Sequence, residues 1–500
     1  MKRKFTFIIV LICAVASAQN IQDVLRYSSE NLLGTARYQA MSGAFGALGG
    51  DMSAINVNPA SSAVFKNSLF AITGAAYNNK NETSYFGTFR NSNLTSWKFN
   101  QIGGAFVWKN NQKSWKKISL AFNYDLANNF DDEFFASGTN FTGIDTYFLN
   151  LAQGLPFGSL LIRDNEFIED AYLRIGSSLG YGPQQAFLGY FGGVINPVDE
   201  TDLEGTDYVS NAEYTNVFQD YYQSTRGYNS KFTVNLAGQY EDFLFIGGSM
   251  NFNSVYFEKF SRFDETGYDS GSALQFVNFD NLLVTRGNAF SFNLGAIAKL
   301  NNSFRLGASY QSPIWYDLRD DLSQRINSNL ADDDIGFINF SLINVFERYQ
   351  VKTPSKFTGS AAIVFGKQGL ISFDYSYQDM SKAQLRPTGD PSFNTVNTQI
   401  ASELGSIDTF RVGGEYRLDN VSLRAGYRYE GSPYLDGFTI GDLQGFSGGF
   451  GINFGGSRLD FAYSRTERDV TQQLFDTGVT SSALINQIRN NYVMSYTINF

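Results

Sequence analysis

The chain has 500 residues, of which 16% are aromatic, a net charge of −10 and no histidine. Its acidity makes it a poor candidate for nucleic-acid binding, and the lack of histidine excludes Ser-His and Asp-His catalytic pairs and histidine-ligated metal or haem. We therefore expect no enzyme, no cofactor and no metal site. The length suits either several soluble domains or one large barrel.

Residues 1–18 have the pattern of a secretory signal peptide. Lys2-Arg3-Lys4 precede an apolar run, and Ala16-Ser17-Ala18 end it at a cleavage site. The single cysteine, Cys13, lies inside this segment, so the exported chain is expected to have no disulfide. No later apolar run reaches 18 residues, and a membrane-spanning form must therefore be a β-barrel.

Residues 34–65 contain mostly small side chains, which allow close packing. The run 36–48 predicts a short helix that stops at Gly49-Gly50. Pro59 favours an extended conformation at the residue before it. A compact segment followed by a long β-rich chain predicts a barrel whose lumen is filled by a plug, with the plug over 19–66 and the barrel over 67–500.

The stretch GAFGALGGDMSAINVNPAS (43–61) resembles the N-terminal hatch of the FadL-type outer-membrane transporters of long-chain fatty acids and other hydrophobic compounds. Three later stretches, 306–314, 351–381 and 410–433, resemble barrel strands of that family in the same order. The resemblance implies passive uptake without an energy source and exit sideways through the wall. The hatch residues that it singles out are Gly49, Gly50, Asp51, Asn58, Pro59 and Ala60.

Alternation of apolar and polar residues predicts the barrel strands. It is clearest over 410–418 and 421–430, which a two-residue turn at Asp419-Asn420 joins into a hairpin. Short and long connections alternate along the chain, as in outer-membrane barrels, and the count gives about fourteen antiparallel strands. Residues 79–98 fit either a first loop or strand extensions. The short turns are predicted at 110–113, 241–242, 301–302, 367–369, 419–420 and 455–457.

The hairpin register places Arg411 opposite Arg428 and Glu415 opposite Arg424, on the face predicted to line the lumen. Like charges directly opposite each other are unfavourable, and a guanidinium pair suits a carboxylate. Arg411, Arg424 and Arg428 are therefore candidate lumen residues for a fatty-acid head group. The alternative is that lumen water screens the pair or that acids neutralise it, namely Glu430, Asp374 or an acid of the hatch.

The segment 127–227 is the longest predicted loop, and segments of this length usually carry function or their own structure. The spacing of its aromatic residues predicts short helices at the mouth of the barrel. The resemblance implies that extracellular loops form a first landing site for apolar substrate; packing of the loop against itself is the alternative. The candidate loop residues are Phe141, Phe148, Phe187 and Phe191.

The chain ends in YVMSYTINF, with apolar and aromatic side chains on one face and Phe500 as the last residue. Such an end resembles the signal read by the outer-membrane assembly machinery. The predicted function is passive uptake of long-chain fatty acids or other hydrophobic compounds by a barrel set in outer-membrane lipids. The alternative is a non-transport protein of the same fold that acts in protein secretion or surface binding, including haem binding.

Overall fold

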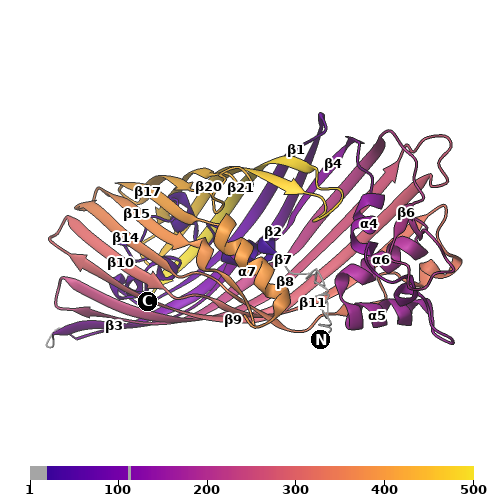
Figure 1. Ribbon diagram of the computed structural model, residues 1–500. Helices are drawn as coiled ribbons and strands as arrows, with labels where there is room; N and C mark the ends of the chain where they lie inside the picture. Colours follow the sequence, from indigo (N-terminus) through magenta and orange to yellow (C-terminus); the bar gives the residue numbers. More distant parts are fainter. Residues whose placement is uncertain (1–19, 111–113) are drawn as a thin grey trace, which may run out of the picture.

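The structure, a computed structural model, describes residues 20–110 and 114–500. The predicted signal peptide lies outside the described residues. Oblique strands form a single barrel, and helices α4 to α6 gather at one of its ends (Figure 1). The sheet closes because the first strand pairs with the last, from Leu69↔Asn499 to Ser84↔Leu484. The predicted fourteen-stranded antiparallel barrel is confirmed.

Several spans consist of two strands in line, separated by a short break. The spans are β1 (Leu69–Tyr85), β2 (Thr88–Lys109), β3 (Trp115–Asn129) with β4 (Asp132–Asn140), β7 (Val217–Tyr240), β8 (Leu244–Thr266), β9 (Phe276–Lys299), β10 (Phe304–Gln311) with β11 (Trp315–Ser328), β13 (Tyr349–Lys352) with β14 (Lys356–Phe365), β15 (Gly369–Asp379) with β16 (Gln384–Arg386), β17 (Ser406–Leu418), β18 (Val421–Glu430), β19 (Leu443–Asn453), β20 (Ser457–Gln473) and β21 (Ser482–Asn499).

The predicted hairpin at Asp419-Asn420 has the predicted register, with Glu415 opposite Arg424 and Arg411 opposite Arg428. Its apolar side chains face outward and its charged ones face the lumen. The other predicted turns also fall at short connections between adjacent strands, except that the turn at 110–113 includes residues outside the described part of the chain. The apolar face of the closing strand is exposed as well.

The strands are longer than the sequence pattern indicated. Residues 79–98 form strand extensions, because β1 and β2 pair as far as Tyr85↔Thr88. Parts of the predicted loop 127–227 likewise belong to strands. These extensions carry polar residues on both faces, as in Asn78–Ser84, so they lack the alternation that marks a strand in a membrane.

Three neighbouring spans break at the same level of the wall. Pro313 separates β10 from β11, and Pro354 separates β13 from β14, since proline cannot donate a ladder hydrogen bond. The 3₁₀ turn η4 (Met380–Lys382) separates β15 from β16. Side chains replace part of the ladder, as where the backbone N–H of Ile314 donates to Thr353 Oγ1 over 2.9 Å.

The segment between β4 and β7 forms a cap at the end of the barrel, as its aromatic spacing predicted (Figure 1). The remaining helices lie in other connections, and α7 runs along the barrel side. Among residues 20–110 and 114–500, no helix is both long and apolar enough to cross a membrane. These elements are α4 (Asp145–Ala152), η2 (Phe157–Leu160), α5 (Ile168–Leu179), α6 (Tyr181–Phe191), β5 (Ile195–Pro197), β6 (Tyr208–Ser210), η3 (Asp333–Phe337), β12 (Asn344–Val345) and α7 (Pro391–Glu403).

The N-terminal residues before β1 pack inside the barrel as a hatch of short helices. The helix predicted over 36–48 ends at Ala40, because Ser42 and Gly43 adopt φ values of 50° and 76° that no α-helix accommodates. The extended conformation predicted before Pro59 is present, with φ −139° and ψ 110°. The hatch elements are α1 (Ile21–Ser28), α2 (Ala36–Ala40), α3 (Ala54–Val57) and η1 (Pro59–Val64).

Candidate functional site

The hatch docks on glycines of the barrel wall. A Cβ added to Gly247 on β8 would lie 2.5 Å from the Pro59 carbonyl oxygen, and one added to Gly295 on β9 would overlap Asn58 Oδ1. Only glycine permits an approach this close. The other wall glycines that a hatch residue approaches closely are Gly103, Gly307, Gly413, Gly426 and Gly449.

Asn58 and its neighbours join the hatch to β9. The Asn58 amide donates to the carbonyl oxygens of Gly46, over 2.8 Å, and of Ala296 on β9, over 2.9 Å. Its Oδ1 accepts the backbone N–H of Ala60 over 3.1 Å. The predicted residues Asn58-Pro59-Ala60 thus contact β8 and β9 close to the strand ends at the short turns.

The other predicted hatch residues shape the loop that precedes α3. Gly49 and Gly50 have φ values of 60° and 70°, which favour glycine. The Asp51 carboxylate accepts the Thr35 hydroxyl over 2.6 Å and the Ser53 backbone N–H over 3.0 Å. Asp51 therefore joins the start of α2 at Thr35 to the turn before α3 at Ser53.

The predicted arginine pair faces the lumen and is neutralised by acids, as the simpler of the two sequence hypotheses held. Glu30 of the hatch forms an ion pair with Lys356 and lies 3.3 Å from Arg411 Nη2. Arg428 Nη2 donates to the Glu30 carbonyl oxygen over 3.1 Å, and Arg428 forms a second ion pair with Glu430. Glu30 and Lys356 are functional candidates that the sequence analysis missed.

Burial alone would raise the pKa of the Glu30 carboxyl, but the positive charges of Lys356, Arg411 and Arg428 hold this pKa well below its ordinary value. The Glu30 side chain is 37% accessible although it lies deep in the barrel, because it faces internal cavities. The carboxylate is therefore charged, held by cations and reachable from the lumen.

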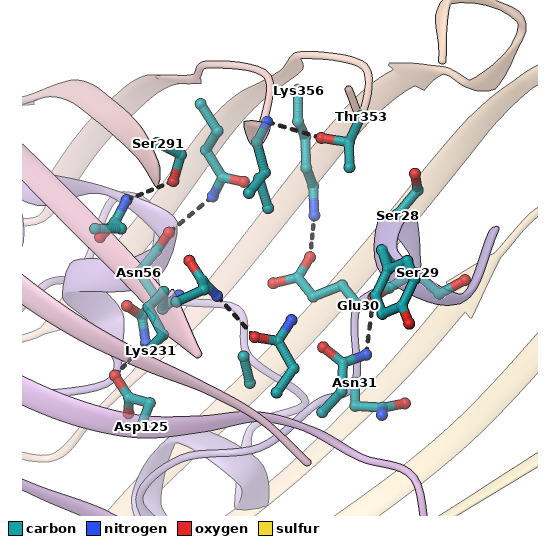
Figure 2. Close-up of a pocket in the computed structure, with 18 of the residues that line it drawn as sticks. Ser28, Ser29, Glu30, Asn31, Asn56, Asp125, Lys231, Ser291, Thr353 and Lys356 are labelled. Atoms are coloured by element: carbon teal, nitrogen blue, oxygen red, sulfur yellow. Dashed lines mark hydrogen bonds and ion pairs between the residues drawn. The ribbon is translucent and has the colours of Figure 1, made fainter. Parts of the chain in front are cut away.

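Ser29, Glu30 and Asn31 line both of two cavities in the lumen, and Figure 2 shows these residues at one of the two. We call these three residues the partition. The upper cavity, on the cap side, has a volume of about 280 Å³, and apolar residues such as Leu25, Phe130 and Phe257 form part of its lining. The inner cavity has a volume of about 120 Å³ and a largely polar lining. The Glu30 ion pair thus lies at the boundary between the two spaces.

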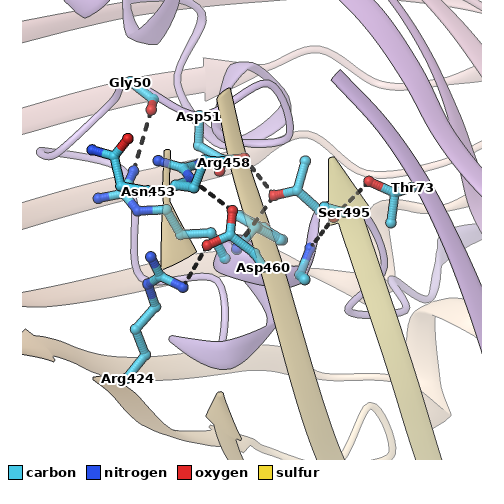
Figure 3. Close-up of polar contacts among 12 residues, drawn as sticks. Gly50, Asp51, Thr73, Arg424, Asn453, Arg458, Asp460 and Ser495 are labelled. Carbon is cyan, nitrogen blue, oxygen red and sulfur yellow. Dashed lines mark hydrogen bonds and ion pairs between the residues drawn. The ribbon is translucent and has the colours of Figure 1, made fainter. Parts of the chain in front are cut away.

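Arg424 belongs to a second, fully paired network that joins hatch and wall. Arg424 lies 2.8 Å from Glu415 and 2.8 Å from Asp460, and Arg37 of the hatch lies 2.8 Å from Glu415. Figure 3 shows Arg424, Asp460 and Arg458 beside the hatch residues Gly50 and Asp51. Because carboxylates occupy its guanidinium, Arg424 holds the hatch in place and has little capacity left for a ligand.

The backbone ladder between β2 and β3 is incomplete. It runs from Gln101↔Asp125 to Lys109↔Lys117, and above Gln101 the described part of β2 pairs with β1 alone. Polar side chains bridge the gap, including an ion pair of 2.6 Å between Lys98 and Asp131. We call this part of the wall the β2–β3 seam.

The four predicted loop phenylalanines do not form one surface. Phe148 and Phe187 are fully buried in the core of the cap, and Phe191 packs against that core. Phe141 is 73% exposed at the start of the cap. Of the four predicted rings, Phe141 is therefore the one that the surface of the cap exposes, whereas the other three stabilise the cap.

The comparison with known families adds an independent observation. Residues 204–492 match the family described as outer membrane protein transport protein (OMPP1/FadL/TodX). The chain belongs to this family. No curated protein is significantly similar to it in sequence.

Solved structures of the FadL/TodX type share its fold. A Pseudomonas aeruginosa FadL homologue is 12% identical with a TM-score of 0.56, over 95% of this chain and 100% of the homologue. The Pseudomonas putida toluene transporter TodX is 13% identical with a TM-score of 0.51, over 94% of this chain and 99% of TodX.

As a FadL/TodX-family barrel, the protein is a multi-pass β-barrel of the outer membrane. Its family and structural neighbours are transporters and channels, and they do not favour the secretion or surface-binding alternative. The described residues contain no group of three or more side chains suited to hold a metal ion.

Proposed function

We propose that the protein takes up long-chain fatty acids and related hydrophobic compounds passively across the outer membrane. The observation that carries this proposal is Glu30, a carboxylate held by Lys356 and Arg411 at the partition. A fatty-acid head group is the same chemical group, so it can replace Glu30 on these cations. Apolar residues of the upper cavity then contact the acyl chain.

The route begins at the cap and ends at the β2–β3 seam. Phe141, an exposed aromatic residue of the cap, is where an apolar molecule first lands. After the partition moves, the ligand passes below it and leaves sideways where side chains, rather than a backbone ladder, hold the wall. The structural neighbours include a toluene transporter and a monoaromatic hydrocarbon channel, which indicates that apolar molecules without a carboxylate also suit this fold.

The decisive experiment compares a fatty acid with its methyl ester. Replacing both Arg411 and Arg428 by Gln should weaken oleate binding by about tenfold or more, since a charge-assisted hydrogen bond to Arg411 and the nearby positive charge of Arg428 are lost, and should leave methyl oleate binding unchanged. Arg465→Gln, at an exposed residue, is the control. Equal losses for acid and ester would contradict a head-group role for the pair.

Transport itself is tested in cells. A deletion strain should take up labelled oleate faster when it carries the cloned protein, and the double arginine variant should restore less uptake. Uptake that does not depend on the cloned protein would contradict the proposed function, whatever the binding experiment shows.

A further inference from the structure

The inner cavity, below the partition, is lined mainly by amides and hydroxyls. Seven asparagines and two glutamines are among its lining residues. Figure 2 shows Ser28, Asn56, Asp125 and Ser291 around this space. A cavity for a pure hydrocarbon would be lined by apolar side chains.

Five residues that line this cavity carry a buried oxygen without a protein partner among the described residues. These atoms are Tyr27 Oη, Ser28 Oγ, Asn56 Oδ1, Asp125 Oδ1 and Asn253 Oδ1. Three of them can only accept hydrogen bonds, and the two hydroxyls can also donate one. Buried oxygens of this kind normally have a partner, and rotation of these side chains would present the oxygens to a group in the cavity that brings hydrogen-bond donors.

The charges around the cavity balance. Glu30 is paired with Lys356, and Lys231 lies close enough to Asp125 to interact with its carboxylate. A ligand carboxylate in this space would meet the unpartnered oxygen of Asp125, and an apolar group would leave the free oxygens unpaired. An uncharged group with several hydroxyls avoids both costs.

We infer that the inner cavity binds an uncharged, hydroxyl-rich head group, so that acyl chains carrying a polyol are substrates as well as fatty acids. This inference rests on the proposed function, because the acyl chain must reach the cavity past the partition. A glycerol ester of a fatty acid is the smallest such molecule. Its hydroxyls can donate to Asn253 Oδ1 and both donate to and accept from the Ser28 hydroxyl.

The test measures binding of 1-monooleoylglycerol and of methyl oleate to the purified full chain in detergent. These probes share the acyl chain and differ in the two hydroxyls. The wild type should prefer the glycerol ester by about tenfold, as expected for two added hydrogen bonds. Ser28→Ala should reduce the preference several-fold, and Asn253→Leu should abolish it.

Ser372→Ala is the matched control, because the Ser372 hydroxyl is likewise buried without a partner in the described chain but does not line the cavity. Neither serine variant should lower the melting temperature. If Asn253→Leu fails to fold, the comparison of Ser28→Ala with Ser372→Ala still tests the inference, because only Ser28→Ala should reduce the preference for the glycerol ester. Equal binding of both probes by the wild type would show that water alone fills the cavity, and would overturn the inference.

The outcome for oleate separates the two proposals. Oleate binding and uptake with no preference for the glycerol ester would overturn this inference and leave the proposed function standing. Failure of oleate, methyl oleate and the glycerol ester to bind would overturn both.

Discussion

A single carboxylate, that of Glu30, connects the hatch to the cations of the wall. It contacts Lys356 and Arg411 with its side chain and accepts from Arg428 with its backbone carbonyl. Removing one partner of a buried ion pair leaves the other charge uncompensated, which is costly. Under the proposed function, Glu30 occupies the place of a ligand carboxylate and keeps the arginine pair stable while no ligand is bound.

Glu30→Gln should raise the affinity for oleate several-fold. The neutral amide competes less well for Lys356 and Arg411, so the ligand carboxylate displaces it at a lower cost. Displacement of a fluorescent fatty acid would measure the change. Glu82→Gln, at an exposed pair with Lys80, serves as the control. An unchanged or lower affinity in Glu30→Gln would show that Glu30 does not compete with ligand.

Acid should loosen the hatch through the same residue. Lys356 and the arginines outweigh burial and depress the pKa of Glu30, so its contact contributes fully above the ordinary value of 4.5 and is progressively lost as the pH falls below that value. Conductance in planar bilayers should rise from about pH 5 to about pH 3, and rise less in Glu30→Gln. Identical pH responses of the two proteins would contradict this assignment.

At the scale of elements, the hatch and the wall fit because glycines on seven strands leave room for it. The contact at Gly247 is with backbone atoms of Pro59 and Ala60, which cannot rotate away as a side chain can. The hatch is thus held by shape at these points and by charge at Arg37 and Glu30. Loss of a glycine contact and loss of an ion pair would therefore free different parts of the hatch.

Gly247→Ala should displace η1 from β8. The added methyl group would lie 2.5 Å from the Pro59 carbonyl oxygen, and overpacking of this kind costs about 1–3 kcal/mol. We expect a lower melting temperature and higher conductance. Gly359→Ala is the matched control, since nothing lies within 4 Å of an added Cβ at that position. Equal behaviour of the two variants would show that the wall does not hold the hatch at Gly247.

Local patterns predicted what depends on neighbours in sequence. The hairpin over 410–430 was predicted in full, because alternation fixes its faces and Asp419-Asn420 fixes its register. The strand extensions over 79–98 stayed open because both of their faces are polar. The helix from Ala36 was predicted too long, because Ser42 adopts a left-handed backbone conformation that ends the helix. This conformation is uncommon for serine, so it cannot be predicted from the residue type.

The site depends on contacts that no local pattern records. Lys356 begins a strand of alternating apolar and polar residues, so this pattern predicts that its side chain points into the lumen. Its partner Glu30 lies 326 residues away, and no local pattern predicts their contact. The arginine pair was predicted because register alone places both residues. The burial of Phe148 and Phe187 follows from how α4 and α6 pack, and aromatic spacing does not separate a buried ring from an exposed one.

At the scale of the whole molecule, the barrel is taller than the membrane. β8 has 23 residues, which at about 3.3 Å each and a tilt of about 40° gives a height of roughly 55–60 Å, against an apolar band of about 25 Å. The upper strands and the cap therefore stand roughly 30 Å outside the bilayer. The cap side of the lumen, with the upper cavity, belongs to this outer part.

A cysteine at Glu82 should react with a membrane-impermeant maleimide in intact cells, whereas one at Ile72 should not. Both positions lie on the outward face of β1, ten residues or about 33 Å apart along the strand. Both should react equally in the denatured protein. Protection of the Glu82→Cys variant in cells would show that the membrane covers more of the strand than its polar residues allow.

The pairing of Arg37 with Glu415 also concerns the biogenesis of the protein. These residues are 378 positions apart, and the Ala36 backbone N–H donates to Ser495 Oγ, which is 459 positions away. Contacts of such separation form only after nearly the whole chain is in place. The N-terminal hatch is synthesised first, but its contacts with the wall form last. An unfinished barrel therefore lacks the wall residues that hold the hatch. Closure of the pore and completion of the wall are therefore one event in assembly.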